Sequence, residues 1–204
     1  MAKAFTLYRV FVGSPGGLIR ERELFRDLLL KVTSLWAAPR GVTFEAVGWE
    51  DTVAGRGRPQ ELINEDLRTC DYAVFVLHDR WGSPHGRFSS GTKAELSLAE
   101  DLCREGTMRD IAIFFKKINK AASNASRGDV RKIREFRESL GGRYLFKEYE
   151  SHEMFAYYLE ASLAKWLRDH EDEWSGLEER TPIPTATDRD DETRSSRLKK
   201  TRRR

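Results

Sequence analysis

The sequence predicts a doubly wound α/β fold, in which five parallel strands alternate with five helices. Three observations predict it. Short strand-like runs are separated by segments of helix length, the first run ends at the breaker cluster Gly13–Gly17, and Asp71–Leu77 is hydrophobic without alternation. A run of this last kind is typical of a central parallel strand that is covered on both faces. Because crossovers between parallel strands are right-handed, we expect the strand order 2-1-3-4-5.

Each element has its own signal. Leu7–Val12 is a short β-rich run, and the helix expected over residues 18–36 follows from apolar residues at helical spacing: Leu24, Leu28, Leu29, Val32 and Leu35. A second strand over residues 43–47 opens into the polar segment 49–59, and a helix is expected over 60–69. After the central strand come a helix over 92–104, a strand over 111–115, a helix over 130–140, a short strand over 144–146 and a final helix over 153–170.

The composition suits one folded domain followed by a tail. The chain has 204 residues, of which 39% are hydrophobic and 11% aromatic, and these are rare beyond Trp174. We therefore expect a domain over residues 1–174 and a disordered linker and tail over 175–204. The 36 basic and 33 acidic residues are unevenly placed, since Arg194–Arg204 holds seven basic residues and no acidic one. Such a tail can contact nucleic acid or an acidic partner, or it can be merely solvated.

Other function classes are disfavoured. No run approaches the ~18 apolar residues that span a bilayer, and the first residues do not resemble a signal peptide, so we expect a cytoplasmic protein without membrane contact. Cys70 and Cys103 lack the spacing of a zinc site or a disulfide framework, and the four histidines show no ligand spacing. Neither a metal nor a bound cofactor is predicted.

Ligands of doubly wound sheets bind at the carboxyl ends of the strands, near the switch point between strands 1 and 3. Gly13 and Ser14 lie there, and their loop offers backbone N–H groups and a helix N-terminus to a phosphate, although its glycines can equally serve only to make a turn. The loop has neither GxGxxG nor a P-loop lysine, so no dinucleotide fingerprint is present.

Two further loops at the same edge carry candidate residues. Arg58 and Arg80 can pair with a diphosphate or a ribose hydroxyl, or they can be ordinary exposed arginines. Trp49 and Trp81 can stack on a base, or they can simply pack in the core or at its rim.

Glu95 is the leading candidate for chemistry. It lies in the first turns of the helix that follows the central strand, so its carboxyl group is expected to face the crevice. The alternative is structural: Thr92-x-x-Glu95 also has the spacing of a capping box, in which the two residues satisfy backbone amides at the helix start.

Several of these segments together resemble one family. The segments are Val10–Ser14, Arg20–Arg22, the central strand, Arg80–Ser83 and Ser90–Glu95, and in this order they resemble the TIR-like DUF4062 domains over about residues 5–120. Gly91-Thr92-x-x-Glu95 is also similar to the nucleophile segment of nucleoside deoxyribosyltransferases, another flavodoxin-like group. In both groups a glutamate on this helix acts at the anomeric carbon of an N-riboside, and Glu95 occupies the matching position.

The resemblance implies an N-glycosidase that cleaves NAD or a related nucleotide, with NAD as substrate and no further cofactor. Glu95 would be its nucleophile or electrostatic stabiliser, and the pocket would be shaped by Ser14, Trp49, Asp51, Arg58 and Trp81. It also implies activation by self-association, in a defence or cell-death pathway. The alternatives are a non-catalytic signalling module that recruits a partner protein and a deoxyribosyltransferase-like enzyme.

Overall fold

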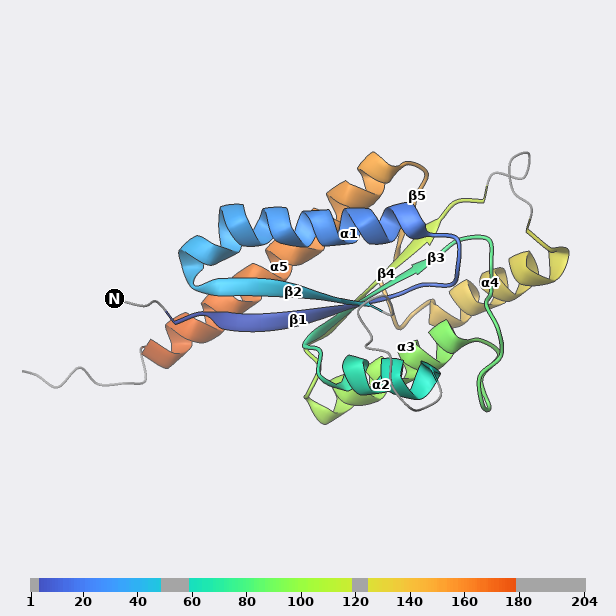
Figure 1. Ribbon diagram of the computed structural model, residues 1–204, viewed down its shortest axis with the longest axis horizontal. Coiled ribbons are helices and arrows are strands. Elements are labelled where there is room, and N and C mark those ends of the chain that lie inside the picture. Colours follow the sequence, from blue (N-terminus) through green and yellow to red (C-terminus); the bar gives the residue numbers. More distant parts are fainter. Residues whose placement is uncertain (1–3, 49–58, 119–124, 179–204) are drawn as a thin grey trace, which may run out of the picture. The chain divides into compact units, whose positions relative to one another are not determined.

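Five strands form one parallel sheet in the order β2-β1-β3-β4-β5 (Figure 1). The computed structural model describes residues 4–48, 59–118 and 125–178. The strands are β1 (Thr6–Gly13), β2 (Val42–Gly48), β3 (Tyr72–Leu77), β4 (Asp110–Lys116) and β5 (Lys147–Tyr149). The predicted fold class and strand order are confirmed, and the carboxyl ends of β1 and β3 lie side by side at the switch point.

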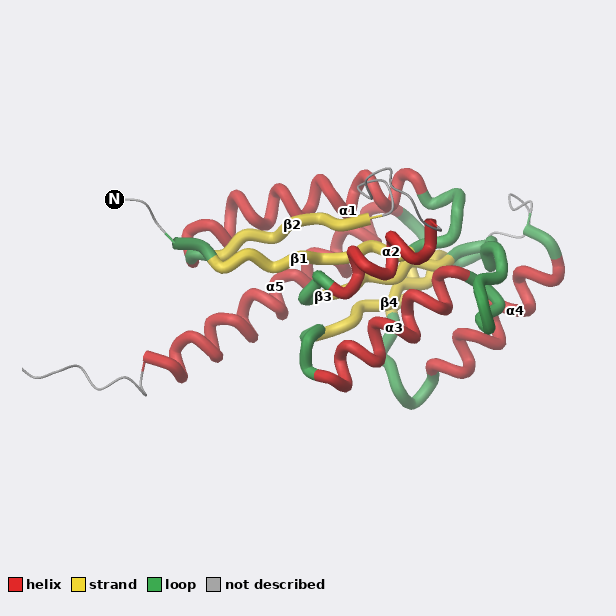
Figure 2. The backbone as a smooth tube through the Cα atoms, turned by 60° about the horizontal axis from the view of Figure 1, so that its bottom comes forward, coloured by secondary structure: helices red, strands yellow, loops and turns green. Residues whose placement is uncertain are grey.

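Helices cover both faces of this sheet (Figure 2). They are α1 (Ile19–Val32), α2 (Pro59–Arg68), α3 (Gly91–Glu105), α4 (Arg127–Leu140) and α5 (His152–Glu178). Helices α2, α3 and α4 pack on one face, whereas α1 and the beginning of α5 lie on the other, as the contact between the rings of Phe114 and Phe155 illustrates. Backbone contacts divide the chain into Met1–Lys165, which contains the sheet, and Trp166–Arg204.

The central strand β3 supplies side chains to both apolar layers. All six of its residues are buried, and Ala73, Phe75 and Leu77 join the core cluster beneath α2, α3 and α4. The intervening residues face the other layer, where the ring of Tyr72 packs edge-on against Tyr8. Since both faces of β3 are apolar, its uninterrupted hydrophobic run is the expected pattern.

The end of the first helix departs from the expected helical spacing. Regular α-helix stops at Val32, and a π turn over Thr33–Ala37 follows. A π turn has a wider period than an α-helix, so the residues within it no longer face the core at the same spacing. Leu28, Leu29 and Val32 are buried as expected, but Leu35 is 58% exposed.

The last strand also lies later than expected. The sequence predicts it over 144–146, but the residues that pair with β4 are Lys147–Tyr149. Tyr144 and Phe146 pack instead against the core cluster, where the Phe146 ring meets Phe115 edge-on. The apolar character of this segment therefore reflects side-chain packing before the strand begins, and the pairing residues at the sheet edge are more polar.

Some expectations fall on residues that the structure does not describe. Trp49, Asp51 and Arg58 lie outside the described ranges, as do residues 179–204 with the basic segment Arg194–Arg204. Among the helices in the described ranges, none combines the length and apolarity needed to cross a bilayer.

A buried ion pair joins four elements at the carboxyl edge of the sheet. The Glu21 side chain on α1 is 2% exposed, and its Oε1 accepts a hydrogen bond of 2.7 Å from Nζ of Lys116 at the end of β4. The Tyr149 hydroxyl donates to the same oxygen at 3.3 Å, and Nε2 of His152 lies 3.3 Å from it. Burial alone would raise the pKa of Glu21, but the hydrogen bond and charge of Lys116 hold this pKa below its usual value.

We predict that Glu21→Gln lowers the free energy of unfolding by about 1.5–3 kcal/mol at pH 7, because Lys116 loses its charged partner. A carboxyl group whose folded-state pKa is depressed stabilises the fold above its unfolded pKa, and this contribution is lost as the pH falls. The deficit of the variant should therefore shrink below about pH 4.5. Urea unfolding at several pH values measures it.

Glu23→Gln is the matched control, since this residue of the same helix is exposed and forms a surface ion pair with Arg20 at 3.0 Å. We expect its effect to stay within about 0.5 kcal/mol. An equal loss in both variants would show that the buried pair contributes no more than a surface one.

Candidate functional site

A cavity of about 230 Å³ opens at the switch point between β1 and β3. We call it the Glu95 cavity. Its walls come from the end of β1 and the loop after it, from the start of α2 and from the start of α3; they include Gly13, Ser14, Gln60, Ile63, Thr92 and Glu95. Segments that are far apart in the sequence thus meet at the place where doubly wound sheets bind their ligands.

The Glu95 carboxyl group is buried in the wall of this cavity. The residue is 7% exposed, and its Oε1 accepts a hydrogen bond of 2.8 Å from Nε2 of Gln60. Burial raises the pKa of Glu95 above its usual value, and the hydrogen bond from Gln60 opposes this shift only in part. A carboxyl group in such surroundings is a candidate for chemistry, because little besides a neutral amide stabilises its charge.

Two glycines make room for this pair. A Cβ atom at Gly13 would lie 2.6 Å from Cε1 of Phe75 and 3.0 Å from Oε2 of Glu95. A Cβ atom at Gly91 would lie 2.6 Å from Oε1 of Gln60. A contact of 2.6 Å with the buried Phe75 ring is closer than real Cβ atoms come, so this approach depends on glycine at position 13. At position 91 the atom met is the end of the flexible Gln60 side chain, so a Cβ atom there would displace the Gln60 amide.

Capping of α3 does not involve Glu95. The N-cap is Ser90, whose extended backbone precedes the helix and whose Oγ accepts a hydrogen bond of 3.2 Å from the N–H of Lys93. The predicted helix starts one residue too late, at Thr92 instead of Gly91. The alternative of a capping box between Thr92 and Glu95 is therefore wrong, because Ser90 takes the capping role and the Glu95 side chain turns toward Gln60.

Gly13 and Ser14 both line the cavity, as the sequence led us to expect. The Ser14 side chain is bound to the first helix, because Nη1 of Arg22 donates a hydrogen bond of 3.0 Å to its Oγ. Arg22 itself is only 6% exposed. The serine hydroxyl is thus fixed in position at the edge of the cavity, next to the end of β1.

Arg80 and Trp81 do not line the cavity. The Arg80 side chain is exposed and passes close to Gly17, whose φ of 99° makes the turn after β1. Trp81 is 3% exposed and belongs to the core cluster, where its ring packs edge-on against Phe136 of α4. Burial of a large apolar ring favours this placement, so the core-packing alternative describes Trp81 better than a pocket role.

Comparison with protein families gives one match. A family model described as a domain of unknown function, DUF4062, matches residues 9–164. The chain belongs to this family. No curated protein matches it. The matched range of this DUF4062 domain includes every described residue that lines the Glu95 cavity.

Two contributors to the site of this DUF4062 domain were not predicted from the sequence. Gln60 stands at the start of α2, at the same sheet edge as Glu95, and Arg22 lies on α1 behind Ser14. A signal for Gln60 exists in hindsight, since Pro59 opens the helix that follows β2 and places the next side chain at the carboxyl edge. For Arg22 the signal was its place in Arg20–Arg22, one of the segments that resemble the family, but its contact with Ser14 was not predicted.

The geometry limits what the site can do. In the described part of the chain, no group of three or more His, Cys, Asp or Glu side chains is placed to hold a metal ion. The cavity is smaller than the ~300–1,000 Å³ of pockets that enclose a whole drug-sized ligand, so it suits one ring of a larger molecule. Among the described residues that line the cavity, the group available for chemistry is the Glu95 carboxyl group beside the Gln60 amide.

We predict that Glu95→Gln stabilises the folded protein at neutral pH. A carboxyl group whose folded-state pKa is raised favours folding below its unfolded pKa, and this contribution is lost as the pH rises through the folded-state pKa. The gain of the variant should therefore grow above about pH 4.5, by up to about 1.4 kcal/mol per pH unit, until the folded-state pKa is reached. Urea unfolding of both proteins between pH 4 and 8 measures it.

The exposed Glu105, the last residue of α3, provides the matched control. Glu105→Gln should leave the pH dependence of stability unchanged. A constant difference between wild type and Glu95→Gln over this range would contradict a raised pKa at Glu95.

Proposed function

We propose that this DUF4062 domain is an N-glycosidase that cleaves NAD or a related nucleotide, with Glu95 as its catalytic residue. The observation that carries the proposal is the buried Glu95 carboxyl group in a cavity wall, held by Gln60 and not used as a helix cap. The similarity of Gly91–Glu95 to the nucleophile segment of nucleoside deoxyribosyltransferases supports the same assignment.

The surroundings of Glu95 suit a transition state that carries positive charge. Cleavage of an N-glycosidic bond passes through an oxocarbenium-like state at the anomeric carbon. A carboxylate that lacks a cationic partner gains more from a developing positive charge than one that is already paired. Substrate binding would thus supply the charge that favours ionised Glu95.

The bond changes are simple. As the C–N bond of the riboside breaks, its electron pair moves to the pyridinium nitrogen, and nicotinamide leaves as a neutral ring. The Glu95 carboxylate either stabilises the cationic sugar or bonds to its anomeric carbon. Water then adds its oxygen to that carbon and releases a proton; where Glu95 had bonded to the carbon, this bond breaks and its electron pair returns to the carboxylate. Because the leaving ring is neutral, no strong general acid is needed in addition to the Glu95 carboxylate.

The size of the cavity suits the reacting sugar. A ribose ring next to Glu95 would bring its attached groups toward Ser14 and the loop after β1. Backbone N–H groups of this loop and the N-terminus of α1 are suited to a phosphate. Self-association in a defence or cell-death pathway remains part of the proposal through the family resemblance, and it guides the choice of assay conditions.

We predict that purified protein releases nicotinamide from NAD at concentrations that favour self-association, and that Glu95→Gln lowers this turnover by about 10²–10³-fold or more. Glutamine keeps the size of the side chain and can still accept the hydrogen bond from Gln60, so the fold should persist. Nicotinamide is measured by chromatography, and circular dichroism checks folding.

Glu105→Gln is again the control and should turn over NAD like the wild type. Parallel reactions contain other nucleotides, nucleosides, and a deoxynucleoside with a free acceptor base. Base exchange without hydrolysis would assign a transferase instead of a hydrolase. Intact substrates throughout would contradict catalysis and favour the non-catalytic signalling module.

Gln60 provides a second test, as a positioning residue. Gln60→Met keeps the length of the side chain but removes the donor to Glu95, so we predict a loss of about 10–100-fold in kcat/KM. The reaction needs ionised Glu95, so kcat/KM should rise with pH through the pKa of this residue. Loss of the hydrogen bond raises that pKa further. The rise of kcat/KM with pH, which is the acidic limb of the pH profile, should therefore move to higher pH.

Asn64→Met is the comparison for this experiment, because Asn64 lies one turn along α2 and contacts Gln60 but has no hydrogen bond to Glu95. In Asn64→Met the acidic limb of the pH profile of kcat/KM should stay near that of the wild type. A limb that does not move in Gln60→Met would remove the positioning role from Gln60.

A further inference from the structure

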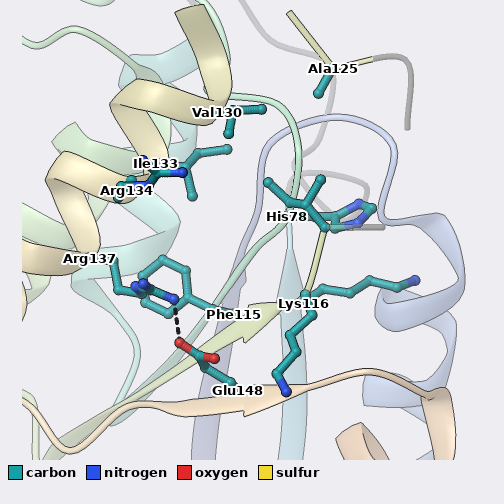
Figure 3. Close-up of a pocket in the computed structure, with 11 residues that line it drawn as sticks. His78, Phe115, Lys116, Ala125, Val130, Ile133, Arg134, Arg137 and Glu148 are labelled. Carbon is teal, nitrogen blue, oxygen red and sulfur yellow. Dashed lines mark hydrogen bonds and ion pairs between the residues drawn. The ribbon is translucent and has the colours of Figure 1, made fainter. Parts of the chain in front are cut away.

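A second and larger cavity lies at the carboxyl ends of β3 and β4, beside α4. We call it the α4 cavity; its volume is about 410 Å³. Figure 3 shows His78 across the cavity from Val130 and Ile133 of α4, and Phe115 of β4 beside Arg137. No described residue lines both this cavity and the Glu95 cavity, so the two are separate places on the same sheet edge.

The inner wall of the α4 cavity is apolar. Phe115, Ile118, Val130 and Ile133 line it, and Phe115 and Ile133 also belong to the core cluster. Its volume falls within the ~300–1,000 Å³ of typical small-molecule pockets, whose walls are mainly apolar with a few polar groups. A flat ring is the kind of group that such a wall accommodates.

Cationic side chains surround this wall. Among the described residues that line the cavity, four are cationic and one is acidic; the cations are Lys116, Lys117, Arg134 and Arg137. Glu148 is the acidic residue, and Arg137 donates a hydrogen bond to it (Figure 3). The carboxylates that pair with the two lysines, Glu21 and Glu150, do not line the cavity.

Arg134 stands out among these cations. It is exposed at the cavity, and the described part of the chain gives it no ion pair. A guanidinium group presents a fork of N–H donors that matches a phosphate or a carboxylate. His78 adds a polar group without charge at neutral pH, since burial lowers its pKa although Asp79 lies 3.2 Å away.

We propose that the α4 cavity binds a small molecule that combines a flat apolar ring with an anionic group. The ring lies against Phe115, Val130 and Ile133, and the anion pairs with Arg134 at the opening. A nucleoside monophosphate and an aromatic carboxylate share this chemistry. The carboxyl edge of the sheet then carries two ligand sites, and the second does not depend on the activity of Glu95.

Calorimetric titration of the full chain tests the proposal with adenosine 5′-monophosphate and with benzoate. Binding of adenosine 5′-monophosphate identifies a nucleotide ligand. Binding of benzoate but not of adenosine 5′-monophosphate identifies an aromatic carboxylate. Adenosine and inorganic phosphate, which each lack one half of this chemistry, should bind at least about 10-fold more weakly. Absence of binding by both complete probes would overturn the proposal.

Two cavity variants and one control locate the bound probe. Arg134→Glu reverses the charge at the opening and should weaken binding by about 10-fold or more. Val130→Phe places a larger side chain in the cavity beside its apolar wall and should also weaken binding. Lys132→Glu changes the net charge by the same amount at an exposed position of α4 outside the cavity, and it should bind like the wild type. Wild-type affinity in either cavity variant, or an equal loss in Lys132→Glu, would overturn the assignment.

Titration of Glu95→Gln separates this proposal from the glycosidase. Binding that depends on Arg134 should persist in this variant, whether or not the wild type cleaves NAD. Binding that is lost in Glu95→Gln and retained in Arg134→Glu would place the probe in the Glu95 cavity and overturn the second site.

Discussion

The close approach of β1, β3 and α3 at Gly13 is the constraint on which the candidate site depends. Gly13 and Phe75 are partners in the parallel register of the two strands, and a Cβ atom at Gly13 would lie 2.6 Å from the Phe75 ring. The same missing side chain leaves space for Oε2 of Glu95. Gly13 is therefore needed both for the packing of the sheet and for the position of the Glu95 carboxyl group. A change in the core at this point would also change the shape of the cavity.

Two buried glutamates differ in the direction of their pKa shifts because their neighbouring side chains differ. Glu21 and Glu95 are both nearly inaccessible, at 2% and 7% exposure. Glu21 lies against the ammonium group of Lys116, which lowers its pKa, whereas burial raises the pKa of Glu95 beside a neutral amide. The first arrangement ties α1 to β4, β5 and α5. The second leaves, among the described residues, a carboxyl group that is paired with a neutral amide, and this is what the proposed stabilisation of a cationic transition state would use.

The carboxyl edge of the sheet also separates two kinds of surface. Among the described lining residues, the small Glu95 cavity between β1 and β3 has Glu95 as its acidic group. The α4 cavity at β3 and β4 is larger, and its described lining is apolar within and mostly cationic around it. Parallel strands bring all their following loops to one edge, so a single sheet can present chemically different sites side by side. Trp81 sits in the core beneath this edge and lines neither cavity.

The sequence by itself determined the strand order, because unbroken apolar runs, breaker clusters and amphipathic spacing are local signals and right-handed crossovers leave few topologies. It also singled out Gly13, Ser14 and Glu95, which follow strands that end at one edge. Only the tertiary structure decided that Ser90 caps α3, that Gln60 and not a backbone amide holds Glu95, and that Trp81 is core. These outcomes depend on which side chains from distant segments are in contact, and the spacing of residue types along the sequence does not determine such contacts.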